Sequence, residues 1–252
     1  MPSLSRRDFT QQALGLVLPV AFLQTLARHD LFAQERRPAV IAWLNRVNQL
    51  GFDLKEQKLT QVEWQKLIEE LYAKADVAGF LELLDFDRLT KNVELVDNGA
   101  RSLQFKFPEI EGVPRNLAWG KQIFLLKPGR SVVPHGHNNM STAFLILRGE
   151  FRGRHYDRVR DEAEHFILRP TIDKTFKPGD CSTVSDQRDN VHWFQSTSRE
   201  TAVIFNIHVT GVNPQNTDPT GRLYVDPRGE KLADGEFRCR RIDYEEAHKL
   251  YG

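Results

Sequence analysis

Residues 134–149 read PHGHNNMSTAFLILRG, in which two histidines stand one residue apart before an apolar run that ends at a glycine. In a β-strand, side chains two residues apart point to the same face, so the imidazoles of His135 and His137 would face the same side. Imidazole is the commonest metal ligand among side chains, but two histidines can equally form a polar pair at the mouth of a barrel. The stretch therefore predicts a strand and offers two interpretations of its histidines.

The sequence pattern changes near residue 93, from amphipathic helical segments to short β-rich runs. These runs lie at residues 102–107, 122–126, 143–147, 164–168 and 201–209. Glycine-containing turns separate them, such as KPG at 127–129 and KPGD at 177–180. Many short strands without long helices between them predict a mainly β fold, an antiparallel double-sheet β-barrel.

The glycines and histidines around the opening stretch are spaced as in a known motif. The spacing resembles the first motif of the cupin family and is carried by Gly129, His135, His137 and Gly149. A later segment, DNVHWF at 189–194, resembles the second cupin motif, which supplies a third histidine. The resemblance implies a cupin-type jelly roll over residues 93–212. The metal ligands that it implies are His135, His137 and His192.

Thr142 stands where most cupins have a glutamate ligand. The three-histidine thiol dioxygenases, which include the cysteine and cysteamine dioxygenases and the plant cysteine oxidases, also lack that carboxylate. The sequence resembles the cysteamine and plant branch in Met140 and in the DNVH segment at 189–192. This resemblance implies an enzyme that converts a small thiol and dioxygen into a sulfinate, with Fe(II) as cofactor and Mn, Ni or Zn as alternatives. Three neutral imidazoles would leave the full charge of the ion available to a thiolate.

The resemblance leaves several roles open. Arg115 is the implied counterpart of the arginine that binds the substrate carboxylate in cysteine dioxygenases, although an arginine at a strand edge is usually solvated. Thr142 cannot form the cysteine–tyrosine cross-link of the animal enzymes. His208 is a satisfied barrel histidine, a residue behind the ligands, or a replacement for His192. A non-catalytic cupin that binds a small ligand or senses metal is the alternative to an enzyme, because this fold hosts many functions.

Residues 36–92 have the pattern of a helical extension packed against the barrel. Amphipathic segments lie at residues 39–50, 63–74 and 77–89, with polar side chains opposite each apolar stripe. Thr60 offers an N-cap for the second segment. Nothing in this extension has the pattern of a catalytic site.

Two polar segments are expected outside the barrel core. The charge-rich run 152–160 predicts a solvated hairpin, and His155 and His165, which stand among charged residues, are expected at the surface. Residues 213–252 begin with a loop rich in Asn, Pro, Thr and Asp, which either covers the barrel mouth or acts as a spacer. The segment ends in a pattern typical of a short helix.

Residues 1–35 have the pattern of an export signal. Arg6 and Arg7 precede an apolar stretch at 13–26 that is short for a membrane span. This arrangement resembles a twin-arginine signal, an address read by the translocation machinery, and the alternative is an N-terminal helix. The expected location is the periplasm. The cleavage site stays open, because LFA at 31–33 matches the small-x-small pattern poorly.

Composition narrows the expected partners. The chain has 252 residues, with 35 Lys plus Arg against 34 Asp plus Glu. Because these charges nearly cancel, no global field would attract nucleic acid, and none is expected as a partner. Cys181 and Cys239 are too few for a disulfide framework and are expected to be structural or free thiols.

Overall fold

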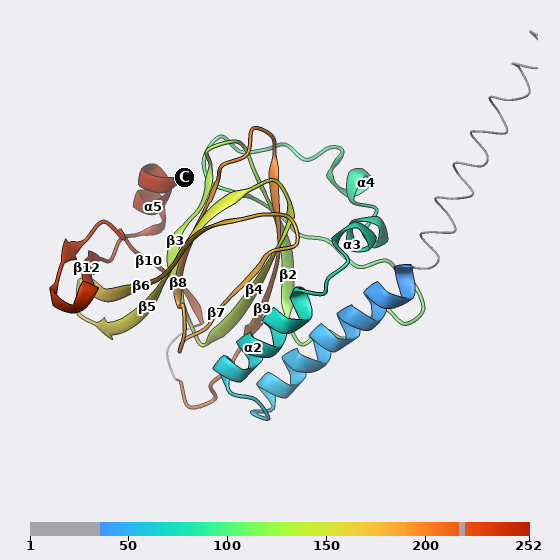
Figure 1. Cartoon of the computed structure of the whole chain (residues 1–252), viewed down its shortest axis with the longest axis horizontal. Helices are drawn as coiled ribbons and strands as arrows, with labels where there is room; N and C mark the ends of the chain where they lie inside the picture. The colour runs from blue at the N-terminus through green and yellow to red at the C-terminus, as the bar shows by residue number, and fades with distance from the viewer. Residues whose placement is uncertain (1–35, 217–219) are drawn as a thin grey trace, which may run out of the picture.

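The computed structural model describes residues 36–216 and 220–252 (Figure 1). The export signal expected at residues 1–35 lies outside the described residues. Within the described ranges, no helix is both long and apolar enough to cross a membrane.

Helices make up the first part of the described chain. They are a helix over residues 36–55, α2 (Gln61–Tyr72), α3 (Val77–Leu83) and α4 (Phe86–Thr90). Thr60 caps α2 as predicted, because its hydroxyl accepts from the backbone N–H of Glu63 at 3.2 Å while the Glu63 carboxylate accepts from the N–H of Thr60 at 2.8 Å. This reciprocal pair satisfies donors that the first turn of a helix leaves free.

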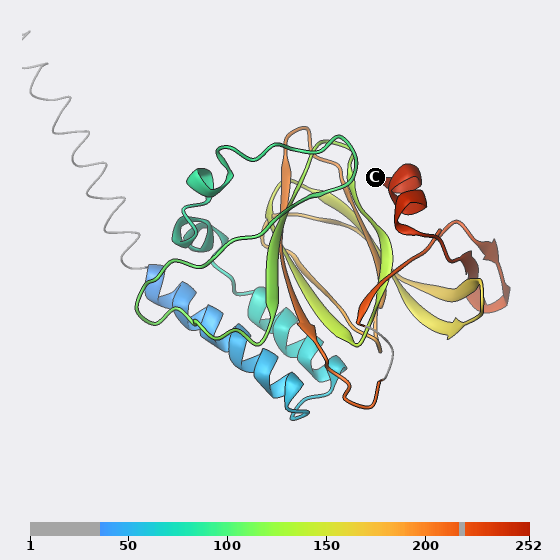
Figure 2. The same cartoon turned by 180° about the vertical axis from the view of Figure 1, so that it is seen from behind.

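The strands form two antiparallel sheets that face each other (Figures 1 and 2). The five-stranded sheet has the order β1 (Arg101–Leu103), β2 (Gly120–Leu126), β9 (Ala202–Thr210), β4 (Met140–Arg148) and β7 (Cys181–Val184). The seven-stranded sheet has the order β10 (Gly221–Tyr224), β3 (Ser131–Asn138), β8 (Val191–Ser196), β5 (Phe151–Asp161), β6 (His165–Phe176), β12 (Phe237–Arg240) and β11 (Glu230–Lys231). The predicted fold class, a mainly β antiparallel double-sheet barrel with helices before it, is therefore confirmed.

Strand β4 buries both of its faces, which explains the unbroken apolar run at 143–147. Phe144 and Ile146 point into the barrel, where they pack in one apolar cluster with rings from the opposite sheet. Ala143 and Leu145 belong to the second cluster, on the outer side of the sheet. A strand covered on both sides reads as continuous apolar sequence instead of alternating.

The helices cover the outer face of the five-stranded sheet. Leu44 from the first helix and Trp64 from α2 share one buried cluster with Leu145 and Phe205 of the sheet. Figure 2 shows the first helix and α2 side by side along the barrel. The extension is thus packed on the side of the barrel, away from the sheet that carries the histidines.

The charge-rich run 152–160 lies on the first strand of a hairpin, as predicted, but only its far end is solvated on both faces, and the expectation that His155 lies at the surface was wrong. These residues form most of β5, a strand in the seven-stranded sheet, and His155 is fully buried. The physical reason is the two-residue period of a strand, because Arg152 faces outward while Phe151 and His155 face the interior. His165, at the start of β6, is half-buried.

The C-terminal segment contains more structure than the predicted loop and short helix. It contributes β10, β11 and β12 to the seven-stranded sheet, a 3₁₀ turn at Ala233–Gly235, and α5 (Tyr244–Tyr251). Helix α5 packs on the outer side of β3, where Ala247 and Tyr251 bury Val133. These strands have two to four residues and are rich in charged side chains, so local sequence predicts them poorly.

Candidate metal centre

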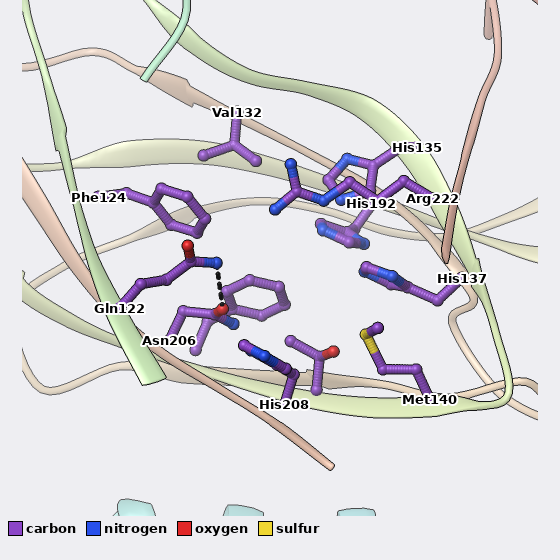
Figure 3. A pocket seen from close by; sticks show the side chains of 12 residues that line it. Gln122, Phe124, Val132, His135, His137, Met140, His192, Asn206, His208 and Arg222 are labelled. Carbon is purple, nitrogen blue, oxygen red and sulfur yellow. Dashed lines mark hydrogen bonds between the residues drawn. The ribbon is translucent and has the colours of Figure 1, made fainter. Parts of the chain in front are cut away.

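The structure brings the three predicted ligands together inside the barrel (Figure 3). His135 and His137 lie on β3, and His192 lies on β8 directly opposite His135. The ring centroids are 4.2 Å apart for His135 and His192, 4.9 Å for His135 and His137, and 5.2 Å for His137 and His192. Each ring offers one nitrogen, and these nitrogens lie within 4.8 Å of one another. This arrangement can hold a metal ion.

The electrostatic setting keeps these imidazoles neutral. Burial lowers the pKa of His137 from 6.5 to about 3, and the positive charge of Arg222 acts in the same direction. Burial is also the largest cause for His135 and His192, whose pKa values lie well below the ordinary value. Neutral imidazole has a free lone pair, so the histidines are in the protonation state that binds a metal ion.

The hydrogen bonds of the cluster fit a metal site. His135 Nδ1 lies 2.8 Å from the carbonyl oxygen of Val133, which fixes Nδ1 as the donor and leaves the lone pair of Nε2 free. Among the described residues, both ring nitrogens of His137 and of His192 are buried without a hydrogen-bond partner. Such orphaned groups destabilise a fold by about 1–3 kcal/mol each. An ion bound by the cluster would satisfy one nitrogen of each ring.

Asn190 and Gly136 fix the backbone that carries His137. The Asn190 side-chain amide donates to the carbonyl oxygens of His137 and Ser185, both at 2.9 Å. A Cβ atom at Gly136 would lie 2.4 Å from Asn190 Oδ1, so glycine is required between the two histidines. The register of β3 against β8 also shifts between Val132 and His135. This irregularity aims the imidazoles into the interior.

The cluster forms one wall of a cavity of about 390 Å³ that opens to solvent. The remaining lining residues are Gln122, Phe124, Val132, Met140, Thr142, Phe144, Asn206, His208 and Arg222. Thr142 stands at the expected glutamate position. Its hydroxyl is buried and has no hydrogen-bond partner among the described residues. No carboxylate belongs to the described lining, so any bound ion is held by neutral groups.

Amide side chains form the polar wall opposite the histidines (Figure 3). Gln122 donates to Asn206 Oδ1 at 3.1 Å and accepts from the hydroxyl of Ser102 at 2.7 Å. Asn206 in turn donates to the carbonyl oxygen of Ala143 at 3.3 Å. Because each amide is held by its neighbours, the wall is pre-organised.

Two further histidines lie close to the cluster without belonging to it. His208 on β9 lines the cavity, but its nitrogens are outside the ligand set, so it does not replace His192. His155 on β5 pairs in register with His192, and its Nε2 lies 3.0 Å from Ser182 Oγ. Burial lowers the pKa of His155 to about 3. The charged neighbours of His155 concealed its burial from sequence reasoning.

Arg115 is not brought to the cavity. It is exposed in the loop between β1 and β2, outside the lining residues. The cationic side chain that does line the cavity is Arg222 on β10, which pairs in register with His137. Arg222 was not predicted from the sequence. The only local signal was that the apolar residues Leu223 and Val225, which follow it, stand two residues apart, as in a strand.

No family model and no curated protein matches the chain. A Klebsiella pneumoniae protein with a double-stranded beta-helix domain is similar in structure, with 12% identity over 53% of this chain and 85% of its own, and a TM-score of 0.35. A cupin superfamily protein from Desulfitobacterium hafniense has 16% identity over 48% and 87%, with a TM-score of 0.31. A recombinant oxalate oxidase in complex with glycolate has 14% identity over 51% and 56%, with a TM-score of 0.35. Because these TM-scores are 0.35 or lower, no property is transferred from these proteins, and the functional argument rests on the site of this chain.

Proposed function

We propose that the protein is a metal-dependent dioxygenase that binds Fe(II) through His135, His137 and His192 and oxidises a small thiol to a sulfinate. The observation that carries the proposal is a buried cluster of three neutral imidazoles beside a small cavity that has no carboxylate in its described lining. Imidazole ligands suit Fe, Zn, Cu and Ni, and three of them leave coordination positions open. The bound ion supplies the dioxygen chemistry that no side chain can perform.

The cavity walls of this chain support the reaction by position and by exclusion of water. Phe124, Val132 and Phe144 give the cavity an apolar floor next to the histidines, which strengthens electrostatic interactions there. The neutral imidazoles do not compete with a thiolate for the charge of the ion. Both oxygen atoms of dioxygen pass to the sulfur, so the sulfur loses four electrons and dioxygen gains four. No external reductant is required.

Oxygen consumption with product analysis tests this proposal. Iron-loaded protein is mixed with a panel of small thiols, dioxygen uptake is recorded, and the products are identified by mass spectrometry. The expected result is a gain of two oxygen atoms on sulfur, with both atoms labelled when ¹⁸O₂ is used. Tight iron binding without dioxygen uptake across the panel would contradict the enzyme and favour a non-catalytic cupin that binds a ligand or senses metal.

We also propose that residues 1–35 direct export to the periplasm through the twin-arginine translocation machinery. The support is the pair Arg6 and Arg7 in front of a short apolar stretch. Replacing both arginines by lysine is expected to leave the protein in the cytoplasm of a bacterial host, as measured by cell fractionation. Unchanged accumulation in the periplasm would contradict this route.

A further inference from the structure

Helix α2 carries a stripe of polar side chains on the face that it turns toward the barrel. Gln61, Gln65 and Glu69 stand four residues apart, so they lie along one face of the helix, and they are called the polar stripe below. Gln65 is fully buried and Gln61 is 6% exposed. Burial of an amide is unfavourable unless the amide forms hydrogen bonds. The partners of the polar stripe therefore show what it holds.

The hydrogen bonds of the polar stripe lead to the loop 185–190, which connects β7 to β8. Figure 1 shows α2 beside β7, the strand that precedes this loop. Gln65 accepts from the hydroxyl of Ser185 at 2.8 Å. Gln61 accepts from the backbone N–H of Asp186 at 2.9 Å and donates to the carboxylate of that residue at 3.1 Å. The helix thus binds both the side chains and the backbone of the loop.

Ser185 joins the polar stripe to the turn at the start of the loop. Its fully buried hydroxyl donates to Gln65 and accepts from the backbone N–H groups of Gln187 and Arg188, both at 3.1 Å. The backbone N–H of Ser185 donates to the carbonyl oxygen of Arg188 at 3.0 Å. Glu69 pairs with the guanidinium of Arg188. The conformation of the loop is therefore fixed by contacts with α2.

The same loop leads to two ligands of the candidate metal centre. Its last residue, Asn190, donates to the carbonyl oxygens of Ser185 and His137, both at 2.9 Å. His192 follows two residues later, near the start of β8. Hydrogen bonds therefore run without a break from Gln65 through Ser185 and Asn190 to the backbone of His137.

His137 depends on this connection because the strand ladder does not reach it on that side. The pairing of β3 with β8 ends at His135 and His192, so His137 lies beyond the last pair. The amide of Asn190 takes the place that a residue of β8 would otherwise occupy. A shift of the loop would therefore move His137 relative to the other two imidazoles.

We propose that the polar stripe of α2 is a positioning element of the metal centre, in which Gln65 holds the loop 185–190 and thereby sets the position of His137. Gln65 does not line the cavity, so it acts through Ser185 and Asn190. The inference rests on the metal-binding part of the proposed function and is independent of the thiol and of dioxygen. It gives the helical extension a role besides covering the sheet.

The affinity of the folded protein for Co(II) tests this role. Gln65→Met keeps the length of the side chain and removes its amide. Competition with a chelator of known affinity is expected to show about tenfold weaker Co(II) binding, as for other groups that orient a ligand, and the d–d absorption band is expected to shift. The matched control is Ile68→Val, at a fully buried apolar side chain of the same helix. It is expected to lower the urea midpoint while leaving the affinity and the band unchanged.

A double-mutant cycle with Asn190→Ala shows whether the effect passes through the loop. Gln65→Met should weaken Co(II) binding about tenfold in the wild type but by less than about twofold in Asn190→Ala, because residues of one hydrogen-bond network are not additive. In the background of Asn45→Ala, at an exposed residue of the first helix, the full effect of Gln65→Met should remain.

Several outcomes would overturn the inference. They are an unchanged Co(II) affinity in Gln65→Met, an equal loss with and without Asn190, and an equal loss in Ile68→Val, which would mean that affinity follows helix stability. No Co(II) binding by the wild type would overturn both the metal centre and this inference. The expected cycle without dioxygen uptake by the iron form would support the positioning role and reject only the dioxygenase.

Discussion

The two ends of the barrel interior differ in chemistry although the same strands run through both. On β8, Phe194 packs with aromatic rings at the filled end, while His192, two residues earlier, belongs to the metal cluster. On β4, the inward residues change from Ile146 and Phe144 to Thr142. The two-residue period of a strand gives both ends the same geometry, and residue identity alone decides what each end does.

Two further strands of the five-stranded sheet repeat this gradient. On β9 the inward residues run from Ile204 through Asn206 to His208, and on β2 they run from Phe124 to Gln122. At one end, buried apolar side chains stabilise the fold. At the other end, polar side chains are buried, which by itself is unfavourable. Along each strand, different residues therefore stabilise the fold and form the candidate site. Substitutions at the two ends should have different effects.

The largest expected effect is on metal content. Wild-type protein is expected to purify with about one equivalent of iron per chain, and His135→Ala to abolish it, because two remaining imidazoles hold an ion poorly. Elemental analysis of the purified proteins measures this. His208→Ala, which removes a histidine from the cavity wall outside the ligand set, should retain the metal. Full metal content in His135→Ala would disprove the site.

Substitutions at the filled end should lower the free energy of unfolding. Phe194 is fully buried against Phe144, Phe151 and Phe176. Phe194→Ala is expected to lower the free energy of unfolding by about 3–5 kcal/mol through lost burial and the cavity left behind, while folded protein keeps its metal. Urea denaturation gives the value. Val159→Ala, at a side chain that is 42% exposed, should change it by less than about 0.5 kcal/mol.

Acid should destabilise the metal-free protein through its buried histidines. His137 and His155 have pKa values of about 3 in the fold against 6.5 as free side chains, so the unfolded chain binds more protons between these limits. Above about pH 6.5 these two histidines do not lower the free energy of unfolding. As the pH falls from 6.5 toward 3, each group lowers it by up to about 1.4 kcal/mol per pH unit. Urea denaturation at a series of pH values measures this effect. The free energy of unfolding of His155→Leu should fall less steeply with decreasing pH than that of the wild type. Parallel curves would contradict this assignment.

A smaller effect is expected where the backbone of a ligand is held. Asn190→Ala removes the amide that binds the His137 carbonyl oxygen, and metal affinity is expected to fall about 10–100-fold, as for other groups that orient a ligand. Competition with a chelator of known affinity measures the change. The same substitution at the exposed Asn45 serves as control. An unchanged affinity would show that β3 holds its shape without Asn190.

The smallest expected effect is at Thr142. Its hydroxyl is buried without a hydrogen-bond partner among the described residues, so Thr142→Val should raise the free energy of unfolding by about 1 kcal/mol. Metal content should not change, because Thr142 is not in the ligand set. A clear loss of stability, measured by the same urea denaturation, would mean that the hydroxyl has a partner in solution.

The sequence predicted the features that depend on neighbours along the chain. The same-face placement of His135 and His137 follows from strand periodicity, and His192 came from the resemblance of its segment to a second motif. The apolar run at 143–147 predicted a strand, and β4 is that strand. Local pattern sufficed because each of these features is set within a few residues.

Features that depend on distant pairing were not predicted. Arg222 reaches the cavity only because a four-residue strand pairs with β3, and nothing in GRLY at 221–224 specifies that partner. His155 was misjudged because its charged neighbours raise the local polarity while pointing to the opposite face. Averaging over a window hides alternation, so a polar segment can still contribute a fully buried side chain.

The buried cluster shared by the helices and the outer face of the five-stranded sheet has a consequence for unfolding. Leu44, Trp64 and Tyr72 lose their partners if the sheet unfolds, and Leu145 and Phe205 lose theirs if the helices detach. A chain cut at residue 92 would expose a contiguous apolar surface, which favours self-association. Helices and barrel are therefore expected to unfold in one cooperative transition, and the barrel is not expected to fold as an independent unit.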